Sequence, residues 1–362
     1  MKSKRLKKQF LINNSLSVTM KLATGFIFIL TLIIGQVYAQ SNSVDKFIEE
    51  GIQLYDKGDF AGALARYREA LNMDEMSPLA NYEIALTYIA LKDYEKAIAH
   101  CENVIKGEST FIDRAYVIYG SALDLKGEPR KAINLYTKAI NEFPENHLLH
   151  YNLAYTCYNL KDYKQAEDAV IKSLLINPGH ASSHLLLGYV MDAQGSRIKT
   201  LLPLYNFLLL EPEGQRAKAA HELLISMLQK GVKIDSDNST AIALENNGEQ
   251  DEFRAADLMI SLLNVSNNTE ENKKKSEREL FYENTRSFFT ILGELKQDNK
   301  GFWWNFYVDF YYAMTRDSNN VETFSYYISQ TNGDEKVREW LANNKDRYER
   351  FSKWFSEFER KD

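Results

Sequence analysis

The strongest constraint on the fold of this chain is an internal period of 34 residues. Three prolines mark the period, Pro144, Pro178 and Pro212, and three small residues repeat with the same spacing: Gly120, Ala154 and Gly188. Two series with one period in the range of about 20 to 50 residues indicate a solenoid of stacked supersecondary units. The sequence therefore predicts a helical-repeat scaffold, although it does not identify the partner.

Each period is expected to fold as two antiparallel helices joined by a short turn. Small side chains recur where the helices must approach closely, and larger side chains recur about one turn further on. One helix pair cannot bury its apolar face alone, so neighbouring pairs must stack. The small residues are Gly51, Ala85, Gly120, Ala154, Gly188, Ala63, Ala97, Ala132 and Ala166, followed by Thr200, and the larger ones are Tyr67, Cys101, Tyr136, Val170 and Leu204.

This pattern resembles the tetratricopeptide repeat (TPR), a helix-turn-helix unit of about 34 residues. The matching segments, among them GIQLYDKGDFAGALARYREAL and YNLAYTCYNLKDYKQAEDAVIKSLLINP, cover roughly residues 44–214. The resemblance implies an all-α fold, a right-handed α-solenoid of about five helix hairpins. The first two copies carry Glu75 and Ser109 in place of the terminal proline, and the fifth copy departs at Thr200 and Pro203.

The domain organisation is predicted from the point where the repeats end. Residues 40–230 are expected to form the solenoid, with an amphipathic capping helix over 215–230. Residues 231–276 are expected to form a polar, loop-like linker with a short helix, and residues 277–362 an aromatic-rich helical C-terminal domain. The segment IKTLLPLYNFLLLEP is apolar nearly all round, which indicates that the C-terminal part covers this last repeat helix.

Residues 20–40, MKLATGFIFILTLIIGQVYAQ, have the layout of a secretory signal peptide that is cleaved after Ala39. We expect residues 1–39 to be removed on export, with translation starting at Met1 or, as the sequence also suggests, at Met20. The protein is then periplasmic or envelope-associated, with no stable membrane span after cleavage. An uncleaved N-terminal anchor is the alternative, but the apolar run is somewhat short for a span of about 20 residues.

The charge of the chain argues against nucleic acid as a ligand. Residues 1–39 contain six basic and no acidic residues, so the remainder has 38 basic and 50 acidic residues, a net charge of −12. Neutralising phosphates requires a basic surface. We therefore expect a protein or peptide partner.

No motif in the sequence indicates catalysis, and the chain is expected not to be an enzyme. It lacks a phosphate-binding glycine loop and a zinc-protease His-Glu pair. The pairs His147/His150 and His180/His184 have spacings that could bind a metal, but no cysteine cluster accompanies them. No catalytic residue, metal or cofactor is therefore expected.

The two cysteines, Cys101 and Cys157, lie two repeats apart. In an oxidising compartment they could pair. Both occupy positions where apolar residues recur, which favours buried free thiols.

The TPR resemblance implies that the first helix of each repeat lines a groove for an extended peptide or a partner helix. In this chain one series of groove positions comprises Ile48, Tyr82, Val117, Tyr151 and Leu185. We expect apolar burial there, with tyrosine hydroxyls as hydrogen-bonding groups. Packing within the scaffold is the alternative role for these tyrosines. The candidate partner-binding residues are Tyr82, Leu86, Tyr151, Tyr155, Tyr158 and Tyr189.

All four tryptophans, Trp303, Trp304, Trp340 and Trp354, lie in the C-terminal region. They are expected to form the core of a helical cap on the fifth repeat, or alternatively to present an aromatic surface to a partner or a glycan. The expected function is a non-enzymatic interaction scaffold of the cell envelope. The alternatives are a self-associating structural protein and glycan binding through the aromatic region, and the sequence leaves the oligomeric state open.

Overall fold

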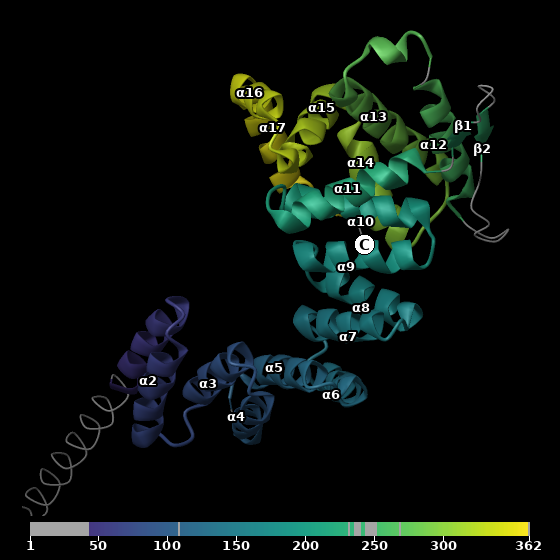
Figure 1. Ribbon diagram of the computed structural model, residues 1–362. Helices are drawn as coiled ribbons and strands as arrows, with labels where there is room; N and C mark the ends of the chain where they lie inside the picture. Colours follow the sequence, from purple (N-terminus) through teal and green to yellow (C-terminus); the bar gives the residue numbers. More distant parts are fainter. Residues whose placement is uncertain are drawn as a thin grey trace, which may run out of the picture. The chain divides into compact units, whose positions relative to one another are not determined.

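The computed structural model describes residues 43–107, 109–230, 232–234, 240–242, 252–267 and 269–360 (Figure 1). The expected signal peptide, residues 1–39, lies outside this range. The chain divides into two compact units, residues 1–135 and 136–362. The domain boundaries expected near residues 230 and 276 stay predictions.

The first unit consists of consecutive helices that pack in pairs, as the repeat pattern predicts. Small residues allow the pairs to approach closely. A Cβ atom on Gly51 would lie 2.3 Å from the ring of Tyr67, so glycine is required there, and Ala63 and Ala97 are fully buried. The helices are residues 43–56, α2 (Phe60–Met73), α3 (Pro78–Ala90), α4 (Tyr94–Lys106), α5 (Ile112–Leu125) and the start of α6 (Pro129–Glu142).

Aspartate side chains begin the second helix of several repeats. Asp59, Asp93 and Asp162 are the N-caps of α2, α4 and α8, and each carboxylate accepts a hydrogen bond from a backbone N–H in the first turn. Such caps satisfy amide groups that have no partner within the helix. The helix starts are therefore encoded locally as well as by the repeat.

The turn before each of these second helices contains one residue in the left-handed region. Glycine occupies this position in three repeats, at Gly58, Gly127 and Gly195. In the other two repeats lysine takes its place, at Lys92 with φ 59° and Lys161 with φ 64°. A lysine in this region is strained because its Cβ crowds the backbone.

The second unit continues the helix pairs and ends them with one more helix. A Cβ atom on Gly188 would lie 2.9 Å from Leu204, which again marks a close approach. The helix α10 runs through Pro203 without a break. The helices, after the end of α6, are α7 (His147–Asn159), α8 (Tyr163–Ile176), α9 (Ala181–Ala193), α10 (Arg197–Leu210) and α11 (Gln215–Gln229).

The described residues that follow α11 form helices and one short strand pair. The linker was expected to be loop-like, but β1 and β2 pair in antiparallel register, with Val232 opposite Ile242. The elements are β1 (Val232–Ile234), β2 (Thr240–Ile242), α12 (Arg254–Ser266), η1 (Asn272–Lys274), α13 (Glu277–Lys296), the π-helical turn η2 (Trp303–Val308), α14 (Asp309–Met314), α15 (Ser318–Ile328), η3 (Gln330–Asn332), α16 (Glu335–Asn343) and α17 (Lys345–Glu357).

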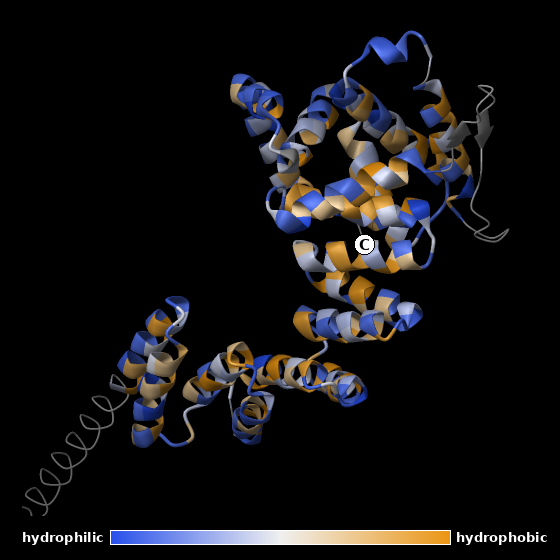
Figure 2. Ribbon diagram, in the orientation of Figure 1, coloured by the Kyte–Doolittle hydropathy of each residue, from blue (hydrophilic) through white to orange (hydrophobic). Residues whose placement is uncertain are grey.

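Aromatic side chains of the C-terminal helices pack on α10. Tyr205 of α10 is fully buried, and its ring centroid lies 5.1 Å from that of Phe289 and 6.1 Å from that of Tyr311. The Tyr311 hydroxyl donates to the carbonyl oxygen of Leu202 at 2.7 Å. The apolar residues of α9 and α10 (Figure 2) are thus covered, as the all-round apolar pattern of α10 predicts.

The tryptophans take part in this packing. Trp303 and Trp304 are buried, Trp340 stacks on Tyr326 at 4.0 Å, and Trp354 stacks on Phe310 at 5.7 Å. Trp303 and Trp304 therefore belong to the interior, whereas Trp340 and Trp354 are half-buried, each with one ring face stacked on a neighbour. This packing favours the core role over a glycan-binding aromatic surface.

Arg197, at the start of α10, forms hydrogen bonds with α11 and an ion pair with α12. Its side chain is 4% exposed and donates to the carbonyl oxygens of Met227 and Leu228 at 2.6 and 2.8 Å, at the end of α11. It also pairs with the Asp257 carboxylate of α12 at 3.0 Å. The arginine thus satisfies carbonyl groups that lack partners at a helix C-terminus.

Arg360 makes a similar connection near the end of the chain. Its guanidinium lies over the ring of Phe306, 4.3 Å from the centroid, and donates to the side-chain oxygen of Asn206 in α10 at 2.6 Å. Contacts of a guanidinium with an aromatic face are stabilising when they are shielded from water.

Both cysteines are buried free thiols, so the disulfide alternative is wrong for this structure. Burial raises the pKa of the Cys101 thiol to about 12, which keeps it protonated and unreactive. Within the described residues, no helix is both long and apolar enough to cross a membrane.

Candidate functional site

Four of the six predicted binding residues lie in the second unit, on its first-of-repeat helices. Tyr151, Tyr155 and Tyr158 belong to α7, and Tyr189 belongs to α9. Spacings of four and three residues place the three tyrosines of α7 along one side of the helix. These four residues are named the tyrosine face below.

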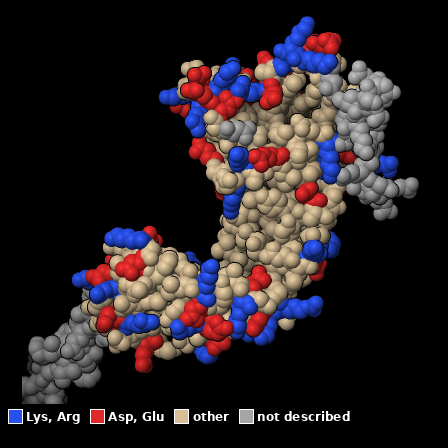
Figure 3. Space-filling view, in the orientation of Figure 1, with Lys and Arg blue, Asp and Glu red and all other residues tan. Residues whose placement is uncertain are grey.

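The tyrosine face combines ring contacts with exposure. The rings of Tyr151 and Tyr155 stack with centroids 6.4 Å apart, and Tyr158 lies 5.9 Å from Tyr163 of the next helix. Tyr155 is 46% exposed although it is a large aromatic residue. Figure 3 shows few charged side chains over α8 and α9 on the side that it displays. An exposed aromatic ring held by a neighbour is a preferred anchor for a protein partner.

Polar groups that the sequence analysis missed surround Tyr151. The Ser182 side chain acts to lower the pKa of Tyr151, and its hydroxyl accepts a hydrogen bond from Arg216 at 3.1 Å. Arg216 also donates to both carboxylate oxygens of Glu211, at 3.0 and 2.7 Å. Ser182 and Arg216 are 34 residues apart, so extending the repeat period into the capping helix would have predicted this contact.

The hydroxyls of Tyr151, Tyr158 and Tyr189 remain protonated at neutral pH. Partial burial raises the pKa of each one. The Arg216 charge opposes the rise in pKa at Tyr151 and Tyr189 without cancelling it. The tyrosine face therefore offers neutral hydroxyls, which can both donate and accept hydrogen bonds, together with apolar ring surface.

The other two predicted residues, Tyr82 and Leu86, lie on α3 in the first unit. Both are partly buried and pack against an apolar cluster that includes Cys101 and Val104. The Tyr82 ring lies 5.7 Å from that of Phe111. Their contacts fit a packing role within the scaffold, and a role in binding a partner stays a prediction.

Two further positions of the predicted groove series are interior residues. Ile48 is 2% exposed and Leu185 is 7% exposed. Ile48 packs in a core cluster with Leu64 and Tyr67. These two side chains therefore do not form part of a binding surface, because each helix turns some of its apolar residues toward the neighbouring repeat.

The paired histidines make structural hydrogen bonds. His150 Nε2 lies 3.0 Å from the Pro144 carbonyl oxygen, and His184 Nε2 lies 2.9 Å from that of Pro178. The two contacts are one repeat period apart, so the histidines fasten the turn that follows each terminal proline. In the part of the chain that the structure describes, no group of three or more His, Cys, Asp or Glu side chains could hold a metal ion.

The class of protein follows from a comparison with known families. Models of the tetratricopeptide repeat match residues 48–107 and 125–195. These segments coincide with helix pairs of both units. Residues 48–107 and 125–195 are therefore tetratricopeptide repeats, and the repeat type expected from the 34-residue period is confirmed.

The curated relatives match over part of their length only. The chain is 28% identical over 142 residues to the BBSome complex member BBS4 of Bos taurus, which covers 39% of this chain and 27% of that protein. It is 24% identical over 170 residues to a TPR repeat-containing protein of Methanocaldococcus jannaschii, covering 41% of this chain and 28% of that one.

Several solved structures are similar to part of this chain at low identity. PilF of Pseudomonas aeruginosa is 18% identical, with 65% of this chain and 97% of that chain covered and a TM-score of 0.45. MamA is 23% identical, with 47% and 93% covered and a TM-score of 0.39. YrrB, described as a TPR protein with an unusual peptide-binding site, is 19% identical, with 51% and 98% covered and a TM-score of 0.38.

Proposed function

We propose that this protein is a non-enzymatic interaction scaffold that binds a protein partner, as an extended peptide or a helix, on the tyrosine face of its second unit. The exposure of Tyr155 carries the proposal. Its ring stacks on that of Tyr151 but is 46% exposed, so packing of the repeat core does not require an aromatic residue at this position. Interface hot spots are enriched in such residues.

The chemistry of the surface indicates the kind of partner. The tyrosine face offers ring surface and neutral hydroxyls, and its nearest cation, Arg216, is already paired with Glu211. A terminal carboxylate or a phosphate would need an unpaired cation. The partner is therefore a segment with apolar side chains whose backbone polar groups reach the tyrosine hydroxyls.

The location proposed for this activity is the cell envelope, on the strength of the signal-like segment in residues 20–40. The relative BBS4 is by its name a member of a multi-protein complex, which is consistent with an assembly role for TPR segments. Glycan binding through the tryptophans is not retained, because Trp303 and Trp304 are buried and the half-buried Trp340 and Trp354 each stack on a neighbouring ring.

The test uses the partner itself, trapped in cells by a photo-crosslinking amino acid at position 155. Affinity of the purified partner is then measured for the wild-type chain and for Tyr155→Ala/Tyr189→Ala. We expect the double variant to lose about 2 kcal/mol or more of binding free energy, the scale of interface hot spots, while circular dichroism shows an intact fold.

The matched control is Tyr348→Ala, which removes a tyrosine of similar exposure, 38%, on α17. This variant is expected to bind as the wild type does. Equal affinity for the wild-type chain and the double variant would overturn the role of the tyrosine face.

A further inference from the structure

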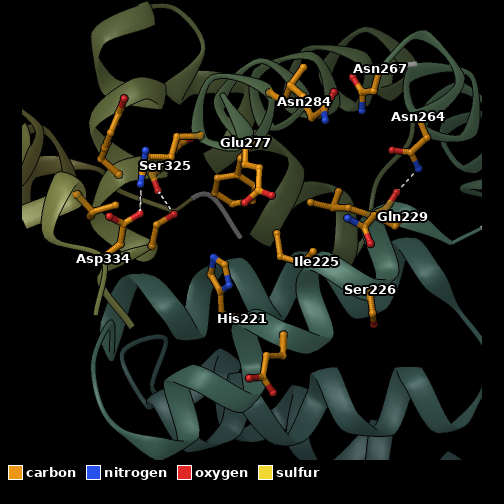
Figure 4. A pocket seen from close by; sticks show the side chains of 18 residues that line it. His221, Ile225, Ser226, Gln229, Asn264, Asn267, Glu277, Asn284, Ser325 and Asp334 are labelled. Carbon is orange, nitrogen blue, oxygen red and sulfur yellow. Dashed lines mark hydrogen bonds and ion pairs between the residues drawn. The ribbon is translucent and has the colours of Figure 1, made fainter. Parts of the chain in front are cut away.

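The second unit contains a cavity that the tyrosine face does not involve. It has a volume of about 1100 Å³ and lies between α11, α12, α13, α15 and α16. Its walls carry amide, hydroxyl and carboxylate groups as well as apolar side chains (Figure 4). A space of this size is comparable to that of sites that enclose small organic ligands.

A buried histidine at the base of the cavity has an unsatisfied ring nitrogen. His221 is 6% exposed, and its ring projects from α11 toward Glu277 (Figure 4). Its Nε2 atom has no hydrogen-bond partner among the described residues. Burial lowers the pKa of His221 to about 4, so the imidazole is neutral at pH 7. A buried polar atom without a partner destabilises a fold, which is consistent with a nitrogen kept for a ligand.

Other polar side chains around the cavity are also free. Within the described part of the chain, the Asn284 amide and the Glu277 and Glu222 carboxylates, which line the cavity, form no hydrogen bond or ion pair. These groups lie on α11 and α13, on either side of His221. Glu222 and Glu277 are exposed, whereas Asn284 is half-buried, so Asn284 is the one of these three groups that is partly withheld from solvent, as His221 is.

The charges of the lining exclude an anionic ligand. Among the described lining residues Arg278 is the one Lys or Arg, and its Nε donates to Asp334 at 2.8 Å. Glu222 and Glu277 have no such partner, so the cavity is acidic overall. A phosphate or carboxylate would be repelled and would find no free cation.

The unused groups include more acceptors than donors, so the ligand must bring many donors. Carboxylates only accept hydrogen bonds, whereas an amide or a neutral imidazole can do both. Each residue of a peptide ligand brings one backbone N–H, while each ring of a saccharide brings several hydroxyls. The aromatic ring of Phe281, 5.7 Å from that of His221, and Ile225 can contact the apolar side of a sugar ring.

We propose that this cavity is a binding site for a short neutral saccharide, with His221 Nε2, Asn284 and Glu277 as the groups that hydrogen-bond to its hydroxyls. The tyrosine face and this cavity are separate sites, so either can exist without the other. Unlike an aromatic surface made by the tryptophans, this site uses polar groups that the fold leaves unpaired.

The experiment probes the full chain on an array of neutral oligosaccharides, with unphosphorylated peptides and sulfated glycans on the same surface. Glycan hits are then titrated as free oligosaccharides by calorimetry. We expect a neutral oligosaccharide to bind the wild type, and Asn284→Ala and His221→Leu to weaken its binding by about tenfold or more, as expected when a hydrogen-bonding partner is removed from a polar ligand.

The matched control is Asn141→Ala, which removes an exposed amide from α6, away from the cavity. It is expected to bind as the wild type does, and melting curves of all variants verify that they fold. The proposal is overturned if no neutral oligosaccharide binds the wild type, if binding is unchanged in both cavity variants, or if these variants affect peptide or sulfated ligands alone.

Discussion

The hydroxyl of Tyr307, in the C-terminal helices, lies 2.7 Å from Nδ1 of His184 in the last repeat. Both side chains are fully buried. The other ring nitrogen of His184 faces the Pro178 carbonyl oxygen at 2.9 Å. The Asn206 amide nitrogen lies 2.9 Å from the same Nε2 atom, so both ring nitrogens of His184 have partners within hydrogen-bonding distance. One histidine thus fastens a repeat turn and the C-terminal helices together.

Replacing His184 by leucine and replacing His221 by leucine should have opposite effects on the free energy of unfolding. His184→Leu leaves the Tyr307 hydroxyl and the Pro178 carbonyl without their partner, and should lower the free energy of unfolding by about 2 kcal/mol or more. His221→Leu removes a buried nitrogen that has no partner and should raise it by about 1 kcal/mol. Denaturant unfolding followed by tryptophan fluorescence measures both, since all four tryptophans lie in the second unit. Equal destabilisation by the two changes would contradict this assignment.

The buried histidines predict that the second unit loses stability in mild acid. Burial lowers the pKa of His184 to about 3 and that of His221 to about 4. Between pH 6.5 and about 4 the unfolded chain binds protons at these histidines and the folded chain does not, so stability falls as pH falls. Each histidine contributes at most about 1.4 kcal/mol per pH unit.

The measurement is the free energy of unfolding at pH 7, 6, 5 and 4.5, each from denaturant titration. His221→Leu serves as the control, because it removes one of the histidines of the second unit whose pKa is lowered by burial, a set that also includes His147, His150 and His180, and it should therefore reduce the slope. A free energy that stays constant between pH 6.5 and 4.5 would show that these imidazoles gain protons in the folded state.

Replacing Arg197 by leucine should cause a large loss of stability. Arg197→Leu leaves Asp257 as a buried carboxylate without its cation and removes the donors to the end of α11. Breaking a buried pair by removing one partner costs about 3 to 5 kcal/mol. The double variant Arg197→Leu/Asp257→Leu should recover part of this loss, since no unpaired charge remains. If the double variant is no more stable than Arg197→Leu, the whole loss of stability comes from the α11 carbonyl groups that have lost their donors, and none of it from the unpaired Asp257 charge.

Replacing Lys161 by glycine should increase stability. Its φ of 64° is strained for lysine, and the same position is glycine in three other repeats. Lys161→Gly should raise the free energy of unfolding by about 0.5 kcal/mol, because relief of strain exceeds the cost of a more flexible unfolded chain. Lys164→Gly, inside α8, should lower it by about 1 kcal/mol. Calorimetric melting compares the two, and a loss of stability in both would refute the strain at Lys161.

Local spacing made the repeat fold predictable. Gly51 packs tightly against Tyr67 and Gly188 against Leu204, the same distance along the chain in both cases, so sequence periodicity is sufficient to locate these helix pairs. The two-stranded β1/β2 pair was missed because three-residue strands in a polar segment carry almost no pattern.

The sites were less predictable than the fold. The tyrosine face follows from spacing, but the exposure of Tyr155 and the burial of Leu185 depend on how neighbouring helices turn. The cavity could not be predicted, because it brings together α11 and helices from 36 to more than 100 residues further along the chain. No periodic signal connects His221 with Asn284.

The contact of Arg360 with Asn206 has a consequence for the order of folding. Arg360 contacts a residue of α10 that is synthesised 154 residues earlier. Until α13 and α14 have been synthesised, α10 lacks the aromatic cover of Phe289 and Tyr311 and exposes leucine-rich surface. Nascent chains arrested before α13 should therefore be recognised by chaperones, whereas the first unit, whose contacts are local, can fold while translation continues.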